Sequence, residues 1–324
     1  MLTLPPFQFH APKSVAEAVA LLQAKAGTAK LIAGGTDLLP NLKHRLFAPE
    51  HVVGLDGIDE LKGVREEQGG LWLGAMTRLA ELAAHPLVAA RYRSLAQAAG
   101  LVAGPQLREM GTLGGNLCLD TRCVYYNQTY FWRKALGFCL KKDGTVCHVV
   151  KSGRNCVAAA SNDTATALLT LGATVRLAGP KGVRELPLND FYVADGVANT
   201  VIEPGELLLG AFVPAPDAGV VTAYQKLRIR GAIDYPALSV AVWARVKAGA
   251  LEDVRLAVSA LAARPHVVKR LEAFAGKSAG AATWTELGVA AMRQCHPLTN
   301  INVDPAWRRE MIPVLVKRAF LDAR

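Results

Sequence analysis

The chain has 324 residues, of which 51% are hydrophobic, and its formal net charge at pH 7 is +10. This length suffices for two or three domains that each bury a core. No apolar run approaches the ~20 residues that a membrane span needs, and the first residues, MLTLPPFQFHAPKS, lack the pattern of a secretory signal. We therefore expect a cytoplasmic protein that does not associate with membranes.

Helical and strand patterns alternate in the first hundred residues. Ser14 is followed by Glu17 and by apolar residues at helical spacing, which predicts a helix with a capping box over residues 14–25. A turn is predicted at Gly34-Gly35-Thr36-Asp37. Short apolar runs predict strands over residues 29–33, 51–55 and 70–74, and helices are expected over residues 77–84 and 92–99.

The second half of the chain divides at a linker. The segment Gly111-Thr112-Leu113-Gly114-Gly115-Asn116 is too rich in glycine for a regular element, and a helix (165–171) and a strand (173–177) follow it. Two prolines and a glycine in residues 213–219 break any element and place a domain boundary near residue 217. Beyond it we expect strands over residues 220–229, 235–246 and 254–261, then helices to the end.

Two glycine turns could bind phosphate. Gly34-Gly35-Thr36-Asp37 and Gly114-Gly115-Asn116 present backbone amides that no side chain covers, and successive amides of this kind can form anion-binding nests. Neither turn fits a P-loop or a Rossmann fingerprint. Together they would suit the pyrophosphate of an elongated dinucleotide. Each of them alone could also be an ordinary turn between two secondary-structure elements. Side-chain contacts could come from Thr36, Asp37, Thr112 and Asn116.

These motifs, in this order, resemble the FAD-binding subunits of the xanthine oxidase family of molybdenum hydroxylases. The resemblance covers nearly the whole chain, from Phe9 to the closing helix near Trp307. It implies that the first segment and the Thr-Leu-Gly-Gly-Asn turn hold the FAD pyrophosphate, that Asp163 bonds a polar part of the cofactor, and that Lys226 lies near the flavin. The implied FAD contacts are Leu31, Ile32, Ala33, Gly34, Gly35, Thr36, Asp37, Leu38, Thr112, Leu113, Gly114, Gly115, Asn116, Asp163 and Lys226.

The cysteine segment, residues 122–157, departs from that family pattern. It holds four of the six cysteines, Cys123, Cys139, Cys147 and Cys156, which are separated by 15, 7 and 8 residues. Clustered thiols in a reducing compartment are more often metal ligands or redox groups than disulfides. Four thiolates suit either tetrahedral zinc or an iron–sulfur cluster. We interpret Cys118 and Cys295 as packing residues and His148 as a surface residue.

The cysteine segment is also basic and aromatic. Seven basic residues against Asp143 account for +6 of the net charge of +10, which suits an acidic partner, either protein or nucleic acid. The alternative is an ordinary solvated loop. A zinc-stabilised nucleic-acid-binding module would explain charge and cysteines but would leave the glycine turns unexplained.

Within the family, a four-cysteine segment at this place is similar to that of the FAD-binding β subunits of 4-hydroxybenzoyl-CoA reductases. That resemblance implies a 4Fe-4S cluster on the four cysteines. It further implies electron transfer from a ferredoxin, through the cluster and FAD, to 2Fe-2S clusters on a small subunit and molybdopterin on a large one, in a dimer of heterotrimers. The substrate would be 4-hydroxybenzoyl-CoA, reductively dehydroxylated to benzoyl-CoA. The alternative is the FAD subunit of a hydroxylating molybdenum dehydrogenase for another aromatic or N-heterocyclic substrate.

From this resemblance we expect an α+β fold and no substrate chemistry on the chain itself. A two-lobed FAD-binding domain of the PCMH/xanthine-dehydrogenase type would span residues 1–216, with lobes 1–55 and 56–216 and the iron–sulfur insert at 122–157. A C-terminal flavoprotein domain (217–324) would contain a three-stranded antiparallel sheet with helices. We also hypothesise that Arg133, Lys141 and Lys142 help to dock an acidic ferredoxin.

Overall fold

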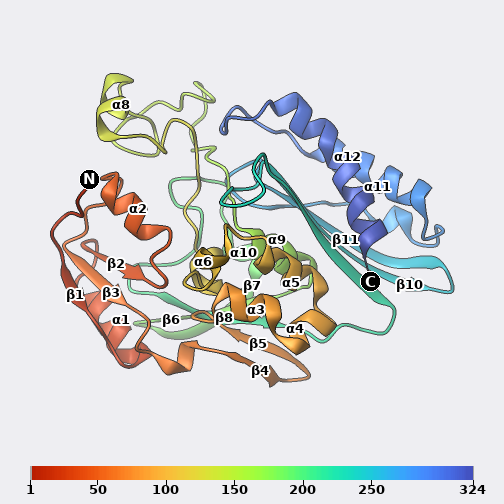
Figure 1. Cartoon of the computed structure of the whole chain (residues 1–324), viewed down its shortest axis with the longest axis horizontal. Coiled ribbons are helices and arrows are strands. Elements are labelled where there is room, and N and C mark those ends of the chain that lie inside the picture. The colour runs from red at the N-terminus through yellow and green to blue at the C-terminus, as the bar shows by residue number, and fades with distance from the viewer. Residues whose placement is uncertain (1, 324) are drawn as a thin grey trace.

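A computed structural model describes residues 2–323 and shows three sheets with helices around them (Figure 1). The first lobe contains a parallel sheet of order β1-β3-β2. The predicted capped helix is present as α1, because Ser14 Oγ accepts a hydrogen bond from the Glu17 amide at 3.2 Å. The elements of this lobe are β1 (Gln8–His10), α1 (Val15–Ala24), β2 (Ala29–Ile32), α2 (Leu38–Lys43) and β3 (His51–Gly54).

The second lobe is built on a five-stranded antiparallel sheet of order β4-β5-β8-β6-β7. Its core is formed by the inward faces of this sheet and by the apolar sides of α3, α5 and α9. The strands are β4 (Val64–Glu67), β5 (Gly70–Gly74), β6 (Thr174–Gly179), β7 (Gly182–Pro187) and β8 (Leu207–Val213). The helices are η1 (Asp59–Leu61), α3 (Leu79–Ala84), α4 (Pro86–Arg91), α5 (Arg93–Gly100), α6 (Pro105–Arg108), α7 (Leu113–Leu117), α9 (Asp163–Thr170) and α10 (Leu188–Phe191).

The helix α7 corrects one prediction. Residues 112–116 were expected to be irregular, yet a short helix forms because Thr112 Oγ1 caps it by accepting from the Gly115 amide at 3.1 Å. Gly114 is needed for close packing, since a Cβ there would lie 2.7 Å from Ala75 Cβ. The glycines therefore permit a tight contact between the helix and the end of β5.

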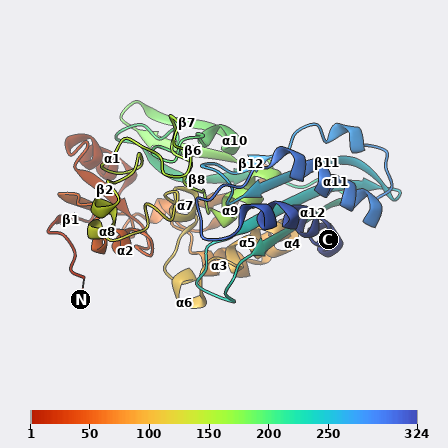
Figure 2. The same cartoon turned by 90° about the horizontal axis from the view of Figure 1, so that it is seen from above.

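The C-terminal domain is an antiparallel sheet of order β12-β11-β10-β9 with two long helices packed on it (Figures 1 and 2). The three expected strands are present, and the two-residue β12 adds a fourth along β11. Trp284 and Phe320 stack at a centroid distance of 4.2 Å between the helices. The elements are β9 (Val220–Leu227), β10 (Leu238–Lys247), β11 (Ala250–Ser259), β12 (His266–Val267), η2 (Glu272–Phe274), α11 (Ala281–Gln294) and α12 (Pro305–Asp322). None of the helices between residues 2 and 323 is both long and apolar enough to pass through a membrane.

The cysteine segment lies beside the first lobe. Its one regular helix is α8 (Tyr130–Ala135), which both views place near α2 (Figures 1 and 2). Leu46, just after α2, packs with Cys123, Tyr126 and Cys156 in a small apolar cluster. The segment is therefore packed against the first lobe, although it lies between α7 and α9 in sequence.

A buried arginine holds the C-terminal domain together. Arg308, on α12, is fully buried and donates to the carbonyl oxygens of Ala237 at 2.8 Å and Leu298 at 3.0 Å, and also to that of Ala260. Burial lowers the pKa of its guanidinium to about 10. The side chain thus links α12 to the segments before β10 and after β11.

Replacing Arg308 with methionine is expected to lower the free energy of unfolding by about 3 kcal/mol, because three buried carbonyl groups lose their donor. Its neighbour Arg309 is exposed, so Arg309→Met should change that free energy by less than about 0.5 kcal/mol. Urea unfolding followed by circular dichroism measures both variants. Equal effects of the two substitutions would show that the buried contacts do not stabilise the domain.

Candidate functional site

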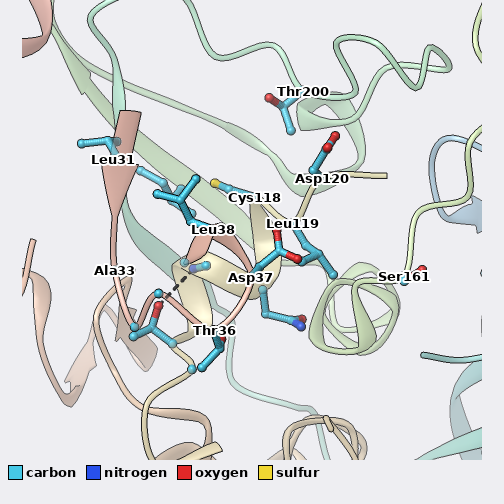
Figure 3. A pocket seen from close by; sticks show the side chains of 18 of the residues that line it. Leu31, Ala33, Thr36, Asp37, Leu38, Cys118, Leu119, Asp120, Ser161 and Thr200 are labelled. Carbon is cyan, nitrogen blue, oxygen red and sulfur yellow. Dashed lines mark hydrogen bonds between the residues drawn. The ribbon is translucent and has the colours of Figure 1, made fainter. Parts of the chain in front are cut away.

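A large cavity lies where the two lobes and the C-terminal domain meet. Its volume is about 640 Å³, which is within the usual range for ligand pockets. In Figure 3 the side chains of Leu31, Thr36 and Leu38 from the first lobe and of Cys118 and Asp120 from the second surround the same space. We call it the interlobe cavity.

Most of the residues implied as FAD contacts line this cavity. They come from the β2–α2 loop, from α7, from the start of α9 and from β9. Ile32 and Leu113 are the two exceptions, since neither belongs to the cavity lining, and Leu113 is fully buried in the core. The residues brought together are Leu31, Ala33, Gly34, Gly35, Thr36, Asp37, Leu38, Thr112, Gly114, Gly115, Asn116, Asp163 and Lys226.

The β2–α2 loop offers unpaired backbone donors to the cavity. Within residues 2–323, the amides of Gly34, Gly35, Thr36 and Asp37 donate to no protein acceptor. Gly35 has a φ of +72°, and a Cβ on Gly34 would lie 1.7 Å from the carbonyl oxygen of Met110. A run of free amides on a glycine loop is the arrangement that binds phosphate oxygens.

The α7 turn contributes differently from the prediction of a second nest. Its first amides are already satisfied, because Gly114 N donates to Ala75 O at 2.7 Å and Gly115 N donates to Thr112 Oγ1. Asn116 Oδ1 accepts from the amide and hydroxyl of Thr164 at 3.0 and 2.6 Å, which ties α7 to the start of α9. This turn therefore shapes the cavity wall, and only the first loop presents a run of free amides.

Asp163 and Lys226 meet in the wall of the cavity. Their side chains are almost fully buried, and Lys226 Nζ lies 2.9 Å from Asp163 Oδ2. Asp163 Oδ1 accepts from the Tyr224 hydroxyl. Burial raises the pKa of the Asp163 carboxyl, and the Lys226 ammonium opposes that shift. Both carboxylate oxygens thus have protein partners, so the group joins α9 to β9 as well as lining the cavity.

Other cavity residues were not found from the sequence. Tyr235, in the loop between β9 and β10, lies with its hydroxyl 3.4 Å from Asp37 Oδ1, so the C-terminal domain reaches the first lobe across the cavity. Cys118 was expected to pack in the interior, but its side chain is exposed on the cavity wall. Cys295 is buried in the core of the C-terminal domain, as expected.

The four predicted ligand cysteines converge. All four are buried and line one small pocket, together with Tyr125, Tyr126 and His148. Burial raises the pKa of the Cys123 thiol to about 11 and also raises that of Cys156. All six cysteines of the chain are free of disulfides. We call this second site the cysteine pocket.

Local structure around the cysteine pocket fixes its walls. Lys142 N and Gly144 N donate to Cys139 O at 2.9 and 3.1 Å and form a tight turn. The sulfur atoms of Cys147 and Cys156 accept from the amides of Val150 and Ala158 at 3.4 and 3.5 Å. Such N–H···S bonds are typical around thiolate ligands and tune the potential of iron–sulfur clusters.

His148 was interpreted from the sequence as a surface residue, but the structure places it in the lining of the cysteine pocket. The side chain is partly buried in the lining of the cysteine pocket, and its Nε2 lies 2.5 Å from Phe138 O. The ring also lies 5.1 Å from that of Tyr125. These contacts occupy one ring nitrogen and hold His148 as a wall of the pocket beside the four thiols.

The basic residues of the cysteine segment do not form a single exposed face. Arg122, Arg133 and Lys141 are buried and pair with Asp37, Asp143 and Asp120. The hypothesis that Arg133, Lys141 and Lys142 dock a partner loses its support, because the first two side chains are nearly fully buried and Lys142 pairs with Asp143 at 3.2 Å. Within residues 2–323, three exposed basic residues of the segment lack an ion-pair partner, namely Lys134, Lys151 and Arg154.

Comparisons with known proteins account for both halves of the chain. The family described as the FAD binding domain in molybdopterin dehydrogenase matches residues 5–216, and the CO dehydrogenase flavoprotein C-terminal domain matches residues 222–323. The carbon monoxide dehydrogenase medium chain of Hydrogenophaga pseudoflava is 32% identical over 319 residues, which cover 98% of this chain and 96% of the relative.

Two further matches are to proteins of the same kind. The FAD-binding subunit of an aldehyde oxidoreductase of Escherichia coli strain K12 is 34% identical over 244 residues, 72% of this chain and 76% of the relative. A structure of the carbon monoxide dehydrogenase from H. pseudoflava, lacking the Mo-pyranopterin moiety of its cofactor, superposes with a TM-score of 0.81 at 32% identity and covers 98% of this chain and 97% of its own.

Proposed function

This chain belongs to the FAD-binding subunits of the molybdopterin dehydrogenase family, and we propose that it is an electron-transfer subunit with two redox sites. FAD would occupy the interlobe cavity, and a 4Fe-4S cluster would occupy the cysteine pocket. The observation that carries the proposal is the convergence of four buried thiols in a pocket that adjoins the flavin cavity. Substrate chemistry would take place on a molybdenum-containing partner subunit.

The interlobe cavity fits FAD in its chemistry as well as in its size. The free amides of Gly34 to Asp37 suit the pyrophosphate, and Asn116 and Thr36 offer side-chain donors nearby. Bound flavin supplies two-electron redox chemistry that can be divided into single-electron exchanges. The chain's own contribution is to bind the cofactor between its lobes and to exclude water from it.

We favour an iron–sulfur cluster over a single zinc ion as the occupant of the cysteine pocket. Among residues 2–323 no three Cys, His, Asp or Glu side chains lie close enough together to hold one metal ion. A zinc ion needs all four sulfurs at about 2.3 Å from one point, whereas a four-iron core holds its thiolates farther apart. Cys123, Cys139, Cys147 and Cys156 would be the ligands, one for each iron.

The reaction of the whole complex has two candidates. The relatives named above act on carbon monoxide and aldehydes, which favours a hydroxylating or dehydrogenating complex with electrons leaving through the flavin. The four-cysteine pocket favours the second candidate, reductive dehydroxylation of 4-hydroxybenzoyl-CoA to benzoyl-CoA with a ferredoxin as donor. Both candidates require a large molybdopterin subunit and a small 2Fe-2S subunit, assembled as a dimer of heterotrimers.

Anaerobic absorption spectroscopy of the purified holo-complex separates the two. In a hydroxylating complex carbon monoxide, an aldehyde or an N-heterocyclic substrate would bleach the flavin band without any added reductant. In a reductive complex only a low-potential donor such as reduced ferredoxin bleaches it, and 4-hydroxybenzoyl-CoA restores the colour. If neither substrate class nor ferredoxin changed the flavin spectrum, an electron-transfer function would be refuted.

A ferredoxin, if it is the donor, should approach the exposed charges of the cysteine segment. Reversing Lys134, Lys151 and Arg154 to glutamate should slow reduction of the complex by reduced ferredoxin about tenfold at low salt, with the difference fading as salt is raised. Stopped-flow absorbance measures the rate. Reversal of three exposed basic residues in the C-terminal domain that also lack an ion-pair partner within residues 2–323, Arg264, Lys269 and Arg318, is the matched control and should have little effect. Equal slowing by both sets would contradict docking at the segment.

A further inference from the structure

Among residues 2–323, two residues are shared by the linings of the interlobe cavity and the cysteine pocket. These are Tyr126 and Lys141. Tyr126 follows Cys123 by three residues, and Lys141 follows Cys139 by two, so each is connected to a predicted ligand by a few covalent bonds. Both side chains are nearly fully buried. The side chains of Tyr126 and Lys141 therefore border both sites.

The ammonium of Lys141 is fixed between the two sites. Its Nζ donates to Asp120 Oδ1 at 2.7 Å and to Thr121 Oγ1 at 2.8 Å, and it also donates to the carbonyl oxygen of Gly196. It lies 4.7 Å from the ring centroid of Tyr126. The side chain is only 5% exposed, so solvent screens its charge poorly. Three protein oxygen atoms therefore accept from the Lys141 ammonium and hold it at this position.

Asp120 holds both of these side chains. One carboxylate oxygen accepts from Lys141, and the other accepts from the Tyr126 hydroxyl at 3.0 Å. Its side chain projects toward the interlobe cavity (Figure 3) and is 22% exposed. The negative charge is therefore better solvated than the positive one. Three neighbouring basic groups, Arg122, Arg133 and Lys142, also pair with carboxylates, the last two with Asp143.

We propose that Lys141 is a positioning and charge-setting residue between the two redox sites, with Tyr126 as the contact between them and Asp120 as their anchor. This inference rests on the proposed function, because it requires a cluster in the cysteine pocket. A fixed positive charge beside a redox group stabilises the reduced form, which carries one more electron, and thereby raises its reduction potential. Asp120 acts in the opposite direction. The ring of Tyr126 fills the space between the sites and keeps water out of it.

The sign of the effect distinguishes this role from simple packing. Lys141→Met preserves much of the side-chain volume and removes the charge, so the cluster should become harder to reduce. At a solution potential where half of the wild-type cluster is reduced, the ratio of reduced to oxidised cluster should fall about tenfold. Asp120→Asn should raise the same ratio, since Thr121 and Gly196 still hold Lys141. A purely structural role would not give opposite shifts.

The measurement is a redox titration of the iron–sulfur signal by electron paramagnetic resonance on the purified holo-complex, with iron content determined on every sample. Lys151→Met, an exposed lysine of the same segment, is the matched control and should leave the ratio unchanged. If the Lys141→Met complex does not retain iron, the Asp120→Asn complex tests the inference. A raised ratio of reduced to oxidised cluster supports the inference, and an unchanged ratio overturns it. Wild-type ratios in an iron-loaded Lys141→Met complex overturn it as well. Absence of iron from the wild-type complex would instead refute the proposed function, so the two failures are distinguishable.

Discussion

Replacing Gly34 with alanine is expected to abolish FAD binding. A Cβ at this position would lie 1.7 Å from Met110 O, and the obstacle is backbone that cannot rotate away. The β2–α2 loop must then shift, and its four free amides move out of the positions from which they line the cavity. We expect FAD per folded chain to fall at least about tenfold, measured as flavin released on denaturation.

Gly280→Ala is the matched control for that experiment. Gly280 lies at the start of α11, away from the cavity, and nothing lies within 4 Å of the place where its Cβ would be built. The control should retain FAD at the wild-type level, and circular dichroism should show that both variants are folded. A folded Gly34→Ala protein with a full complement of FAD would mean that the loop does not bind the cofactor.

Replacing Cys139 or Cys147 with serine is expected to remove the iron–sulfur cluster. Each thiol lies in the wall of the cysteine pocket, and loss of one thiolate leaves an iron without its ligand in a site where no spare cysteine is buried nearby. Iron and acid-labile sulfide should fall from about four per chain to less than about one. Colorimetric iron and sulfide assays on anaerobically purified protein measure the change.

Cys295→Ala serves as the control for the cysteine substitutions. Cys295 is equally buried, but it packs in the core of the C-terminal domain with Leu287 and Ile312. Its replacement should leave iron and sulfide unchanged per folded chain. Iron retained in full by both serine variants would show that the four cysteines are not its ligands.

The sequence could predict where the two sites lie, but not all of the residues that line them. The glycine loop at Gly34 and the four clustered cysteines are visible as patterns, and the structure brings each set together. The segment after Thr112 was predicted to be irregular because it is rich in glycine, but glycine can also be present to allow close packing of a helix. Gly114 is there to let α7 approach Ala75, and the Thr112 cap is enough to begin a helix.

The sequence could not show which basic side chains of the cysteine segment are buried. Arg122, Arg133 and Lys141 add to the basic composition of the cysteine segment in the same way as exposed basic residues do, and only the fold shows that each side chain is buried and pairs with a carboxylate. Their carboxylate partners include Asp37, which is distant in sequence. Tyr235 could not be assigned to the site either, because it lies in an irregular loop with no periodic pattern.

Lys141 shows what the structure adds to such a pattern. In sequence it was one of seven positive charges, and in the fold its ammonium is buried between the two cavities. A charge is costly to bury unless its partners are well placed. Asp120, Thr121 and Gly196 provide those partners, and the same contacts keep the ammonium between the interlobe cavity and the cysteine pocket.

The proposed function requires one chain to hold both FAD and a four-iron cluster. An absorption spectrum of the anaerobically purified protein, with flavin, iron, sulfide and zinc determined on the same sample, tests it most directly. We expect flavin bands with about one FAD, four iron and four sulfide per chain. About one zinc per chain, with no iron and no flavin, would contradict it.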